Sequence, residues 1–250
     1  MRRYVALLGS LALPACGGPA LQIHPDHTAH LGTGLPGLHV ADAAMAGGIP
    51  ETALAVTQGL LAADPGNLDA LAKQGEVLTA MGRTNEAAES YRRALAVAPA
   101  NQAALMGLGR SQLANGDSAA AEQLFRRAVA EAPANAAAQN DLGIALDLQD
   151  QHPEAQTAYR AALAAAPDLA AAQVNLGISY ALGGDTTQAV AMLRPLATGG
   201  KATERIHNDY AAALAMSGDA AGATSVLSSR MSSGQAAAAI STFQALRASP

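Results

Sequence analysis

The chain repeats itself every 34 residues along most of its length. Prolines recur at this interval, at Pro65, Pro99, Pro133 and Pro167. Further columns share the period: glycines (Gly75, Gly109, Gly143, Gly177), alanines (Ala53, Ala87, Ala121, Ala155, Ala189, Ala223), large apolar residues (Tyr91, Phe125, Tyr159, Leu193, Leu227) and a second set of glycines (Gly48, Gly82, Gly116, Gly184, Gly218) that Asp150 interrupts once. A period of this length is typical of a solenoid, in which each unit packs mainly against its neighbours.

Each column has a physical role in a pair of packed helices. The first glycines and the alanines let two helices approach closely, and the large residues fill the space between successive pairs. The second glycines permit the positive φ that ends a helix, and a proline suits the start of the next one. Half of the residues are hydrophobic but only 3% are aromatic. Alanine, the best helix former, supplies most of that apolar content, so the sequence predicts an all-α chain.

This pattern resembles the tetratricopeptide repeat, a helix–turn–helix unit of the same length. The resemblance covers about residues 34–235 and implies a solenoid of about six helical hairpins: 34–67, 68–101, 102–135, 136–169, 170–203 and 204–235. We expect residues 236–250 to form a capping helix and tail. Pro195 lies in the second helix of the fifth unit, where we expect a shortened or kinked helix.

The N-terminal sequence resembles a bacterial lipoprotein signal peptide. Two arginines precede an apolar run at residues 4–13, which is too short to span a bilayer and is typical of a signal peptide. Residues 13–16, Leu-Pro-Ala-Cys, resemble a bacterial lipobox. This implies that residues 1–15 are removed and that Cys16 is acylated, and Gly17 after it favours the outer membrane, facing the periplasm. The alternative is an ordinary cleaved signal peptide with a free cysteine nearby.

Residues 16–33 are rich in Gly, Pro and His, and we expect a flexible tether there. His24, His27 and His30 have a ligand-like spacing, and such a segment can bind Zn or Cu weakly. The alternative is a solvated tether that contains histidine. We predict no cofactor and no metal site.

Motifs for chemistry are lacking. The glycines recur at the repeat spacing, and no Gly-rich loop followed by Lys and Ser/Thr is present. The serines near the C-terminus form no nucleophile elbow. The aromatic residues recur with the repeat and therefore belong to the core. The chain has a formal charge of −5 and no basic patch. We predict that it is not an enzyme and binds neither nucleic acid nor a small-molecule substrate.

The first helix of each unit lines the concave side of such a solenoid. Residues three or four apart on these helices share a face, and a row of asparagines there can donate to and accept from a peptide backbone. The alternative is that the asparagines stitch neighbouring helices. The predicted partner-binding groove contains Lys73, Glu76, Met106, Arg110, Asn140, Asp141, Ile144, Asn175, Ile178, Arg205, Asn208 and Asp209.

A lipoprotein with about six such repeats resembles the tight-adherence (Flp) pilus assembly family called TadD and the type IVa pilotins. The stretch 202–219, with an Arg, an Asn-Asp pair, an Ala-rich helix and a Gly, is similar to the first family. That resemblance implies a scaffold for assembly of a tight-adherence (Flp/type IVb) pilus or secretion complex, acting through the outer-membrane secretin. Two alternatives are a general outer-membrane adaptor that recruits cell-wall enzymes and a periplasmic chaperone for extended polypeptides.

Overall fold

The computed structural model describes residues 35–200 and 202–247, and within them the chain is entirely helical. The described residues contain no strand. The helices are α2 (Leu35–Ala46), α3 (Pro50–Ala63), α4 (Leu68–Ala80), α5 (Thr84–Val97), α6 (Gln102–Ala114), α7 (Ser118–Glu131), α8 (Ala136–Asp147), α9 (His152–Ala165), α10 (Ala170–Leu182), α11 (Thr186–Thr198), α12 (Glu204–Ser217), α13 (Ala220–Leu227) and α14 (Ser233–Arg247). The predicted all-α, hairpin-repeat fold is confirmed.

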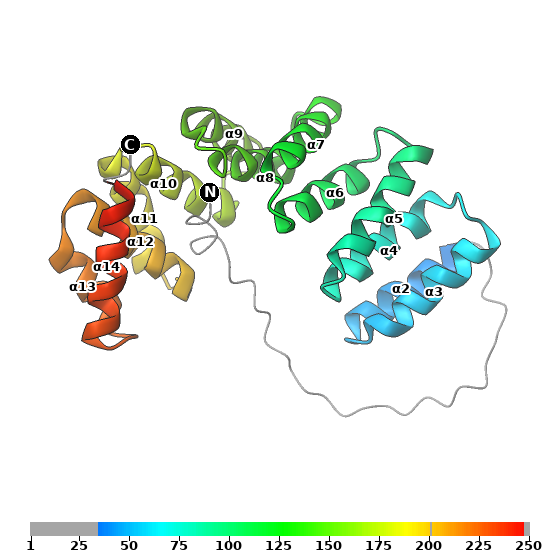
Figure 1. The fold of residues 1–250 in the computed structure, drawn as a ribbon, viewed down its shortest axis with the longest axis horizontal. Coiled ribbons are helices and arrows are strands. Elements are labelled where there is room, and N and C mark those ends of the chain that lie inside the picture. Colours follow the sequence, from blue (N-terminus) through cyan, green and yellow to red (C-terminus); the bar gives the residue numbers. More distant parts are fainter. Residues whose placement is uncertain (1–34, 201, 248–250) are drawn as a thin grey trace. The chain divides into compact units, whose positions relative to one another are not determined.

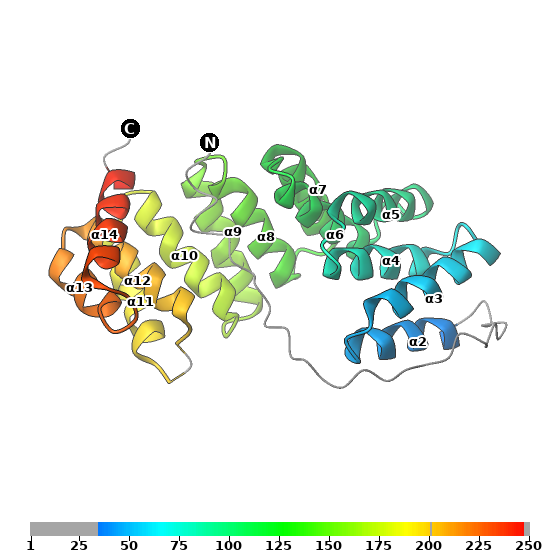
Figure 2. The same cartoon turned by 60° about the horizontal axis from the view of Figure 1, so that its bottom comes forward.

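The helices fall into two compact units, an N-terminal unit up to Asn115 and a C-terminal unit from Gly116 onward. In the N-terminal unit, α2 packs against α3 and α4 against α5, as consecutive hairpins (Figures 1 and 2). In the C-terminal unit the hairpin partners are α8 with α9, α10 with α11 and α12 with α13. The first helices also contact one another there, because α8 contacts α10 and α10 contacts α12.

Asparagine side chains start the first helix of three successive repeats. Asn67, Asn101 and Asn135 each accept a hydrogen bond from the backbone N–H three residues later, at 2.8–3.1 Å. Such N-caps satisfy a donor that the helix itself leaves unpaired, which stabilises the helix by about 1 kcal/mol. Leu169 holds the same place before α10 and makes no side-chain cap, while Thr203 caps α12.

The break between the two helices of a hairpin requires a left-handed residue, as predicted. The five column glycines, Gly48, Gly82, Gly116, Gly184 and Gly218, all have positive φ, from 71° to 98°. Asp150 takes φ 60° and is the one non-glycine residue with positive φ among the described residues. The backbone conformation is therefore set by the repeat, and Asp150 adopts it despite its side chain.

Large side chains of the second helices press against glycines of the first helices. A Cβ added to Gly75 would lie 2.5 Å from the Tyr91 ring, and one added to Gly107 would lie 2.2 Å from the same ring. Gly143 is equally close to Tyr159, and Gly177 is close to Leu193. The predicted close approach is confirmed at Gly75, Gly143 and Gly177. Gly107 lies outside the glycine column, and the periodic pattern did not indicate it.

The C-terminal end closes with three helices. Helix α11 continues through Pro195 and ends at Thr198, so it is one residue shorter than α9, and the proline does not break it. Helix α13 has only 8 residues, and α14 packs against α12 and α13 (Figure 1). Ala236 and Ile240 of α14 are buried there.

None of the helices in the described part of the chain combines the length and apolar character that a membrane crossing requires.

Candidate partner-binding face

Six polar residues of the predicted groove lie on the first helices of the C-terminal unit, and we call them the polar face. Helix α8 carries Asn140 and Asp141, α10 carries Asn175, and α12 carries Arg205, Asn208 and Asp209. Four of these six are buried (Asn140, Asp141, Asn175, Asp209), each with at most 7% exposure. Arg205 is exposed and Asn208 is half-buried.

Asn140 and Asn175 bind each other across the boundary between two repeats. The Nδ2 of Asn175 donates to Oδ1 of Asn140 at 2.9 Å, and the Nδ2 of Asn140 donates to Oδ1 of Asp141 at 3.2 Å. Both asparagines therefore stitch neighbouring helices, which was the alternative to peptide binding. Because each amide offers two donors and two acceptor lone pairs, these bonds use only part of its capacity.

Arg205 extends this network to the next repeat. Its Nη2 donates to Oδ1 of Asn175 at 3.1 Å, and its Nε lies 3.5 Å from Oδ2 of Asp209, one turn further along α12. The hydrogen bonds thus run in one direction, from Arg205 to Asn175, Asn140 and Asp141. Burial raises the pKa of Asp209 to about 6, although the charge of Arg205 opposes this.

Two acceptor atoms of the polar face receive no hydrogen bond. These are Oδ2 of Asp209 and Oδ1 of Asn208, and both atoms are buried. Arg205 is an ion-pair partner of Asp209, but at 3.5 Å its Nε is beyond good hydrogen-bonding distance. Neither oxygen has a hydrogen-bond donor among the described residues, and an unpaired buried acceptor is costly.

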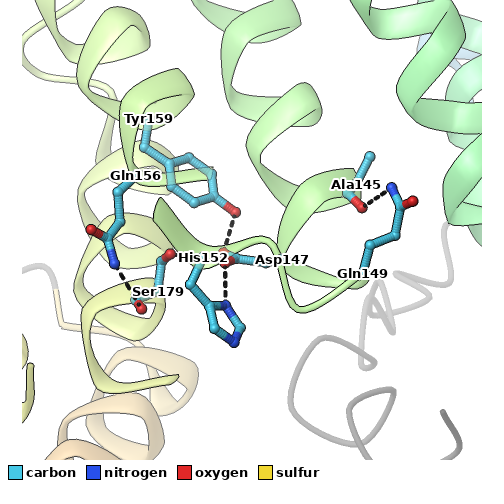
Figure 3. A network of polar contacts seen from close by, with 7 residues as sticks. All are labelled: Ala145, Asp147, Gln149, His152, Gln156, Tyr159 and Ser179. Atoms are coloured by element: carbon cyan, nitrogen blue, oxygen red, sulfur yellow. Dashed lines mark hydrogen bonds and ion pairs between the residues drawn. The ribbon is translucent and has the colours of Figure 1, made fainter. Parts of the chain in front are cut away.

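A second polar cluster surrounds Asp147 at the end of α8 (Figure 3). Its carboxylate accepts from Tyr159 Oη at 3.0 Å and from Ser179 Oγ at 2.8 Å, and His152 Nδ1 lies 2.9 Å away. His152 begins α9, Tyr159 lies in the middle of α9, and Ser179 lies on α10. Burial and the nearby Asp147 charge raise the pKa of Tyr159, so its hydroxyl remains a donor. Because every donor is directed at the carboxylate, the cluster ties two repeats together.

Sequence reasoning assigned Tyr159 to the core, where it is 1% exposed, but it did not find the Asp147 cluster. One signal was present. Asp147 occupies a repeat position held elsewhere by Thr79, Leu113 and Ala181, so a charge replaces a mostly apolar column. A buried charge of this kind requires partners, and His152 begins the next helix.

In the N-terminal unit the predicted residues make a different arrangement. Lys73 Nζ forms ion pairs with Asp42 Oδ1 at 2.7 Å and with Glu76 Oε2 at 2.6 Å. These side chains are partly exposed, and such pairs contribute little to stability. Met106 is 7% exposed and Arg110 is exposed.

The remaining predicted residues lie partly on the surface or outside the described chain. Ile144 and Ile178 are half-buried, and Ile178 packs against the hydrophobic core that α10–α14 share. Cys16 and the three tether histidines lie outside the described residues. Within the described residues, no group of three or more His, Cys, Asp or Glu is placed to hold a metal ion.

Comparison with protein families decides the classification. The model described as "Tetratricopeptide repeat" matches residues 72–136 and 140–202, which is half of the chain. The chain belongs to the tetratricopeptide repeat family. Folds of this family are generally non-enzymatic scaffolds for protein–protein contacts, and no catalytic family is indicated. The comparison with curated proteins gave no match.

Solved structures share the fold. PilW, a widely conserved type IV pilus biogenesis factor, is 21% identical, with a TM-score of 0.71 over 77% of this chain and 90% of PilW. The pilF protein of Pseudomonas aeruginosa is 19% identical, with a TM-score of 0.68 over 84% of this chain and 95% of its own. YrrB, a TPR protein with an unusual peptide-binding site, is 24% identical, with a TM-score of 0.55 over 64% of this chain and 82% of its own. At these identities the similarity concerns the fold.

Proposed function

We propose that this tetratricopeptide chain is a lipid-anchored scaffold of the outer membrane that binds an extended segment of a protein partner on the polar face. The observation that carries the proposal is the unpaired acceptor oxygens of Asn208 and Asp209 on α12, on the same polar face as the bonded amides Asn140 on α8 and Asn175 on α10. A buried polar group without a hydrogen-bond partner lowers the stability of the folded chain, so folding alone gives no reason for it. Such groups are useful where a partner supplies the missing hydrogen bonds. The half-buried Ile144 and Ile178 add apolar contact.

We further propose that the partner belongs to a tight-adherence (Flp/type IVb) pilus or secretion complex, with the outer-membrane secretin as the direct contact. Two observations support this. The stretch 202–219 is similar to the TadD family, and the fold matches that of PilW over most of both chains. PilW itself is a type IV pilus biogenesis factor.

The anchor follows from the lipobox-like sequence that ends at Cys16. Acylation there would hold the repeats at the periplasmic surface of the outer membrane, next to the site where a secretin assembles. Cys16→Ser is expected to move the protein from the membrane fraction to the soluble periplasm. Unchanged fractionation of this variant would argue against the anchor while leaving the repeat scaffold intact.

The partner is tested by capture from crosslinked membranes, with a tag at the C-terminus of the chain and identification by mass spectrometry. The proposal expects a secretin and pilus components as the dominant captured proteins. Recovery of cell-wall enzymes instead would favour the general adaptor, and a scatter of unfolded clients would favour the chaperone. Either result would overturn the pilus assignment.

A further inference from the structure

Helix α2 is the first helix of the N-terminal unit, and its only polar side chains are those of His39 and Asp42. It packs against α3 and α4 (Figure 2). Val40 is 42% exposed, and Ile49, just after the helix, is 43% exposed. Val97 is the one other large apolar side chain that is exposed among the described residues. Exposed apolar side chains are therefore concentrated at α2.

Four exposed residues form a continuous stripe along this helix. Helical spacing places Val40, Ala43 and Gly47 on the same face, because they lie three and four residues apart. Ile49 lies beside Gly47, since a Cβ added to that glycine would lie 3.6 Å from Cγ1 of Ile49. We call these four residues the apolar stripe. None of them is charged, and α2 carries no lysine or arginine.

The last helix of the chain has a different outer surface. Terminal helices of a repeat protein usually present polar residues to water, which keeps the end of the solenoid soluble. Helix α14 follows this rule, and its exposed polar residues are Ser233, Gln235, Ser241, Thr242 and Gln244. On α2 the one carboxylate, Asp42, forms an ion pair with Lys73 of α4, with 2.7 Å between Oδ1 and Nζ. The surface of α2 is therefore the less polar of the two, which favours contact with an apolar partner.

We propose that the apolar stripe of α2 contacts the lipid surface to which Cys16 anchors the chain. This inference rests on the proposed function, because it takes the anchor at Cys16 as its starting point. Residues 17–34 separate Cys16 from α2, and 18 residues span at most about 65 Å when fully extended. An anchored α2 therefore stays near the bilayer, at an effective concentration on the order of millimolar. A few apolar side chains are then sufficient, because stable anchoring commonly combines a lipid chain with a second signal.

A second copy of the chain fits the apolar stripe less well. Each partner in a stable dimer buries about 800 Å² of surface. Two large and two small residues offer much less than that. A lipid surface requires neither this area nor matching hydrogen bonds, since the hydrophobic effect has no direction. Because α2 carries no cation, we expect the contact to depend little on anionic lipids or on salt.

The test uses the full chain coupled through Cys16, its only cysteine, to vesicles of phosphatidylethanolamine and phosphatidylglycerol that contain a maleimide lipid. The chain has no tryptophan, so a single introduced tryptophan reports on one position. Val40→Trp and Ile49→Trp are expected to show blue-shifted emission that brominated acyl chains quench, at low and at high salt. Val97→Trp, at the end of α5 in the same unit, is the matched control and is expected to show neither effect.

A charge placed in the apolar stripe gives the second test. Val40→Asp in the Ile49→Trp chain is expected to abolish the quenching, whereas Val97→Asp in that chain is expected to leave it unchanged. Equal quenching at all three tryptophan positions, or quenching at none, would overturn the inference. A blue shift without quenching that grows with the density of chains on the vesicle would assign the stripe to a second copy, which also overturns it.

The anchor itself is judged separately, by the fractionation of Cys16→Ser in cells. Because the coupling to the vesicles is chemical, quenching is measured whether or not the cell acylates Cys16. Failure of the anchor and failure of the lipid contact are therefore distinguishable.

Discussion

The two units of the chain share the same repeat pattern but differ in how their buried polar side chains are hydrogen-bonded. In the N-terminal unit the buried polar residues are Thr57, Ser90 and Ser111, and each hydroxyl is placed to donate to a backbone carbonyl of its own helix. Ser90 alone among them also contacts a side chain of another helix, Gln74 Oε1 on α4 at 3.0 Å. In the C-terminal unit the buried polar residues are Asn140, Asp141, Asp147, Asn175, Ser179 and Asp209. Most of these bond to side chains of other helices, and Asp209 retains an acceptor without a donor.

One repeat position shows the difference directly. This position holds Lys73 and Gly107 in the N-terminal unit and Asp141, Asn175 and Asp209 in the C-terminal unit, at successive intervals of 34 residues. Lys73 forms partly exposed ion pairs and Gly107 accommodates the Tyr91 ring, whereas the three later side chains are polar and buried. The shared columns determine the fold, and at this variable position only the repeats of the C-terminal unit bury a polar side chain. The C-terminal unit therefore contains buried polar groups that lower its stability and that the fold itself does not require.

The largest effect is expected from removing the carboxylate at Asp147. Asp147→Ala would leave Tyr159, Ser179 and His152 without their acceptor, and we expect a loss of about 3–5 kcal/mol in the free energy of unfolding. Urea denaturation measures it, and hydrogen exchange of α8–α10 localises it. The matched change in the N-terminal unit is Thr79→Ala at the same repeat position, where a neutral hydroxyl donates to the Gly75 carbonyl of its own helix and pairs with Tyr91 on α5. Equal losses for the two variants would contradict the contrast between the units.

The next effect has the opposite sign. Folding raises the pKa of Asp209 from 3.8 to about 6, so the folded chain binds this proton more tightly than the unfolded chain. The buried carboxylate therefore costs nothing below about pH 3, and its cost grows as the pH rises through 3.8 to about 6 and then stays constant. A shift of this size corresponds to about 2–3 kcal/mol. Asp209→Asn is expected to stabilise the chain by this amount at pH 7.5 and by only about a fifth of it at pH 4.

The measurement is the difference in free energy of unfolding between wild type and Asp209→Asn across this pH range, because other groups titrate in both proteins. Asp168→Asn serves as the control and is expected to show no such difference. A variant that is less stable than wild type at pH 7.5 would show that Arg205 fully compensates Asp209, and the functional interpretation would lose its energetic argument.

A smaller loss is expected at Gly107. The Tyr91 ring lies between Gly75 and Gly107, so a methyl group on one side pushes the ring toward the other. We expect Gly107→Ala to destabilise the N-terminal unit by about 1–2 kcal/mol through overpacking. Gly59→Ala is the control, because a Cβ there meets no atom within 4 Å, and it should stabilise α3 slightly. The thermal midpoints of the two variants measure these effects. A Gly107→Ala variant that is more stable than wild type would contradict overpacking of the Tyr91 ring.

The smallest effect concerns the turn of the fourth repeat. Asp150 has φ 60° where the other repeats use glycine, so Asp150→Gly should raise stability by up to about 1 kcal/mol. The reverse change, Gly184→Asp, imposes the strain on a glycine whose added Cβ meets no neighbour, and it should lower stability by a similar amount. If both changes leave the thermal midpoint unaltered, the turn conformation contributes nothing to the difference between repeats.

The sequence predicted the fold because the columns reflect local packing that recurs in every hairpin. The left-handed glycines and the contact of Gly143 with Tyr159 follow directly from that register. The bonding of the candidate site did not follow, because it depends on single residues outside the columns. Asn140 and Asn175 could equally have faced solvent, and only the position of α8 against α10 brings their amides to 2.9 Å. The unpaired oxygens of Asn208 and Asp209 are likewise a property of packing.

The most direct test of the central claim is site-specific photocrosslinking in cells on the polar face of the C-terminal unit. A photoreactive phenylalanine derivative replaces Ile144 or Ile178 on the first helices, and Thr157, exposed on α9, serves as the position on a second helix. The account predicts crosslinks to one partner, a secretin or pilus component, from Ile144 and Ile178 but not from Thr157. Crosslinks to that partner from Thr157 alone would show that the polar face is not the binding surface.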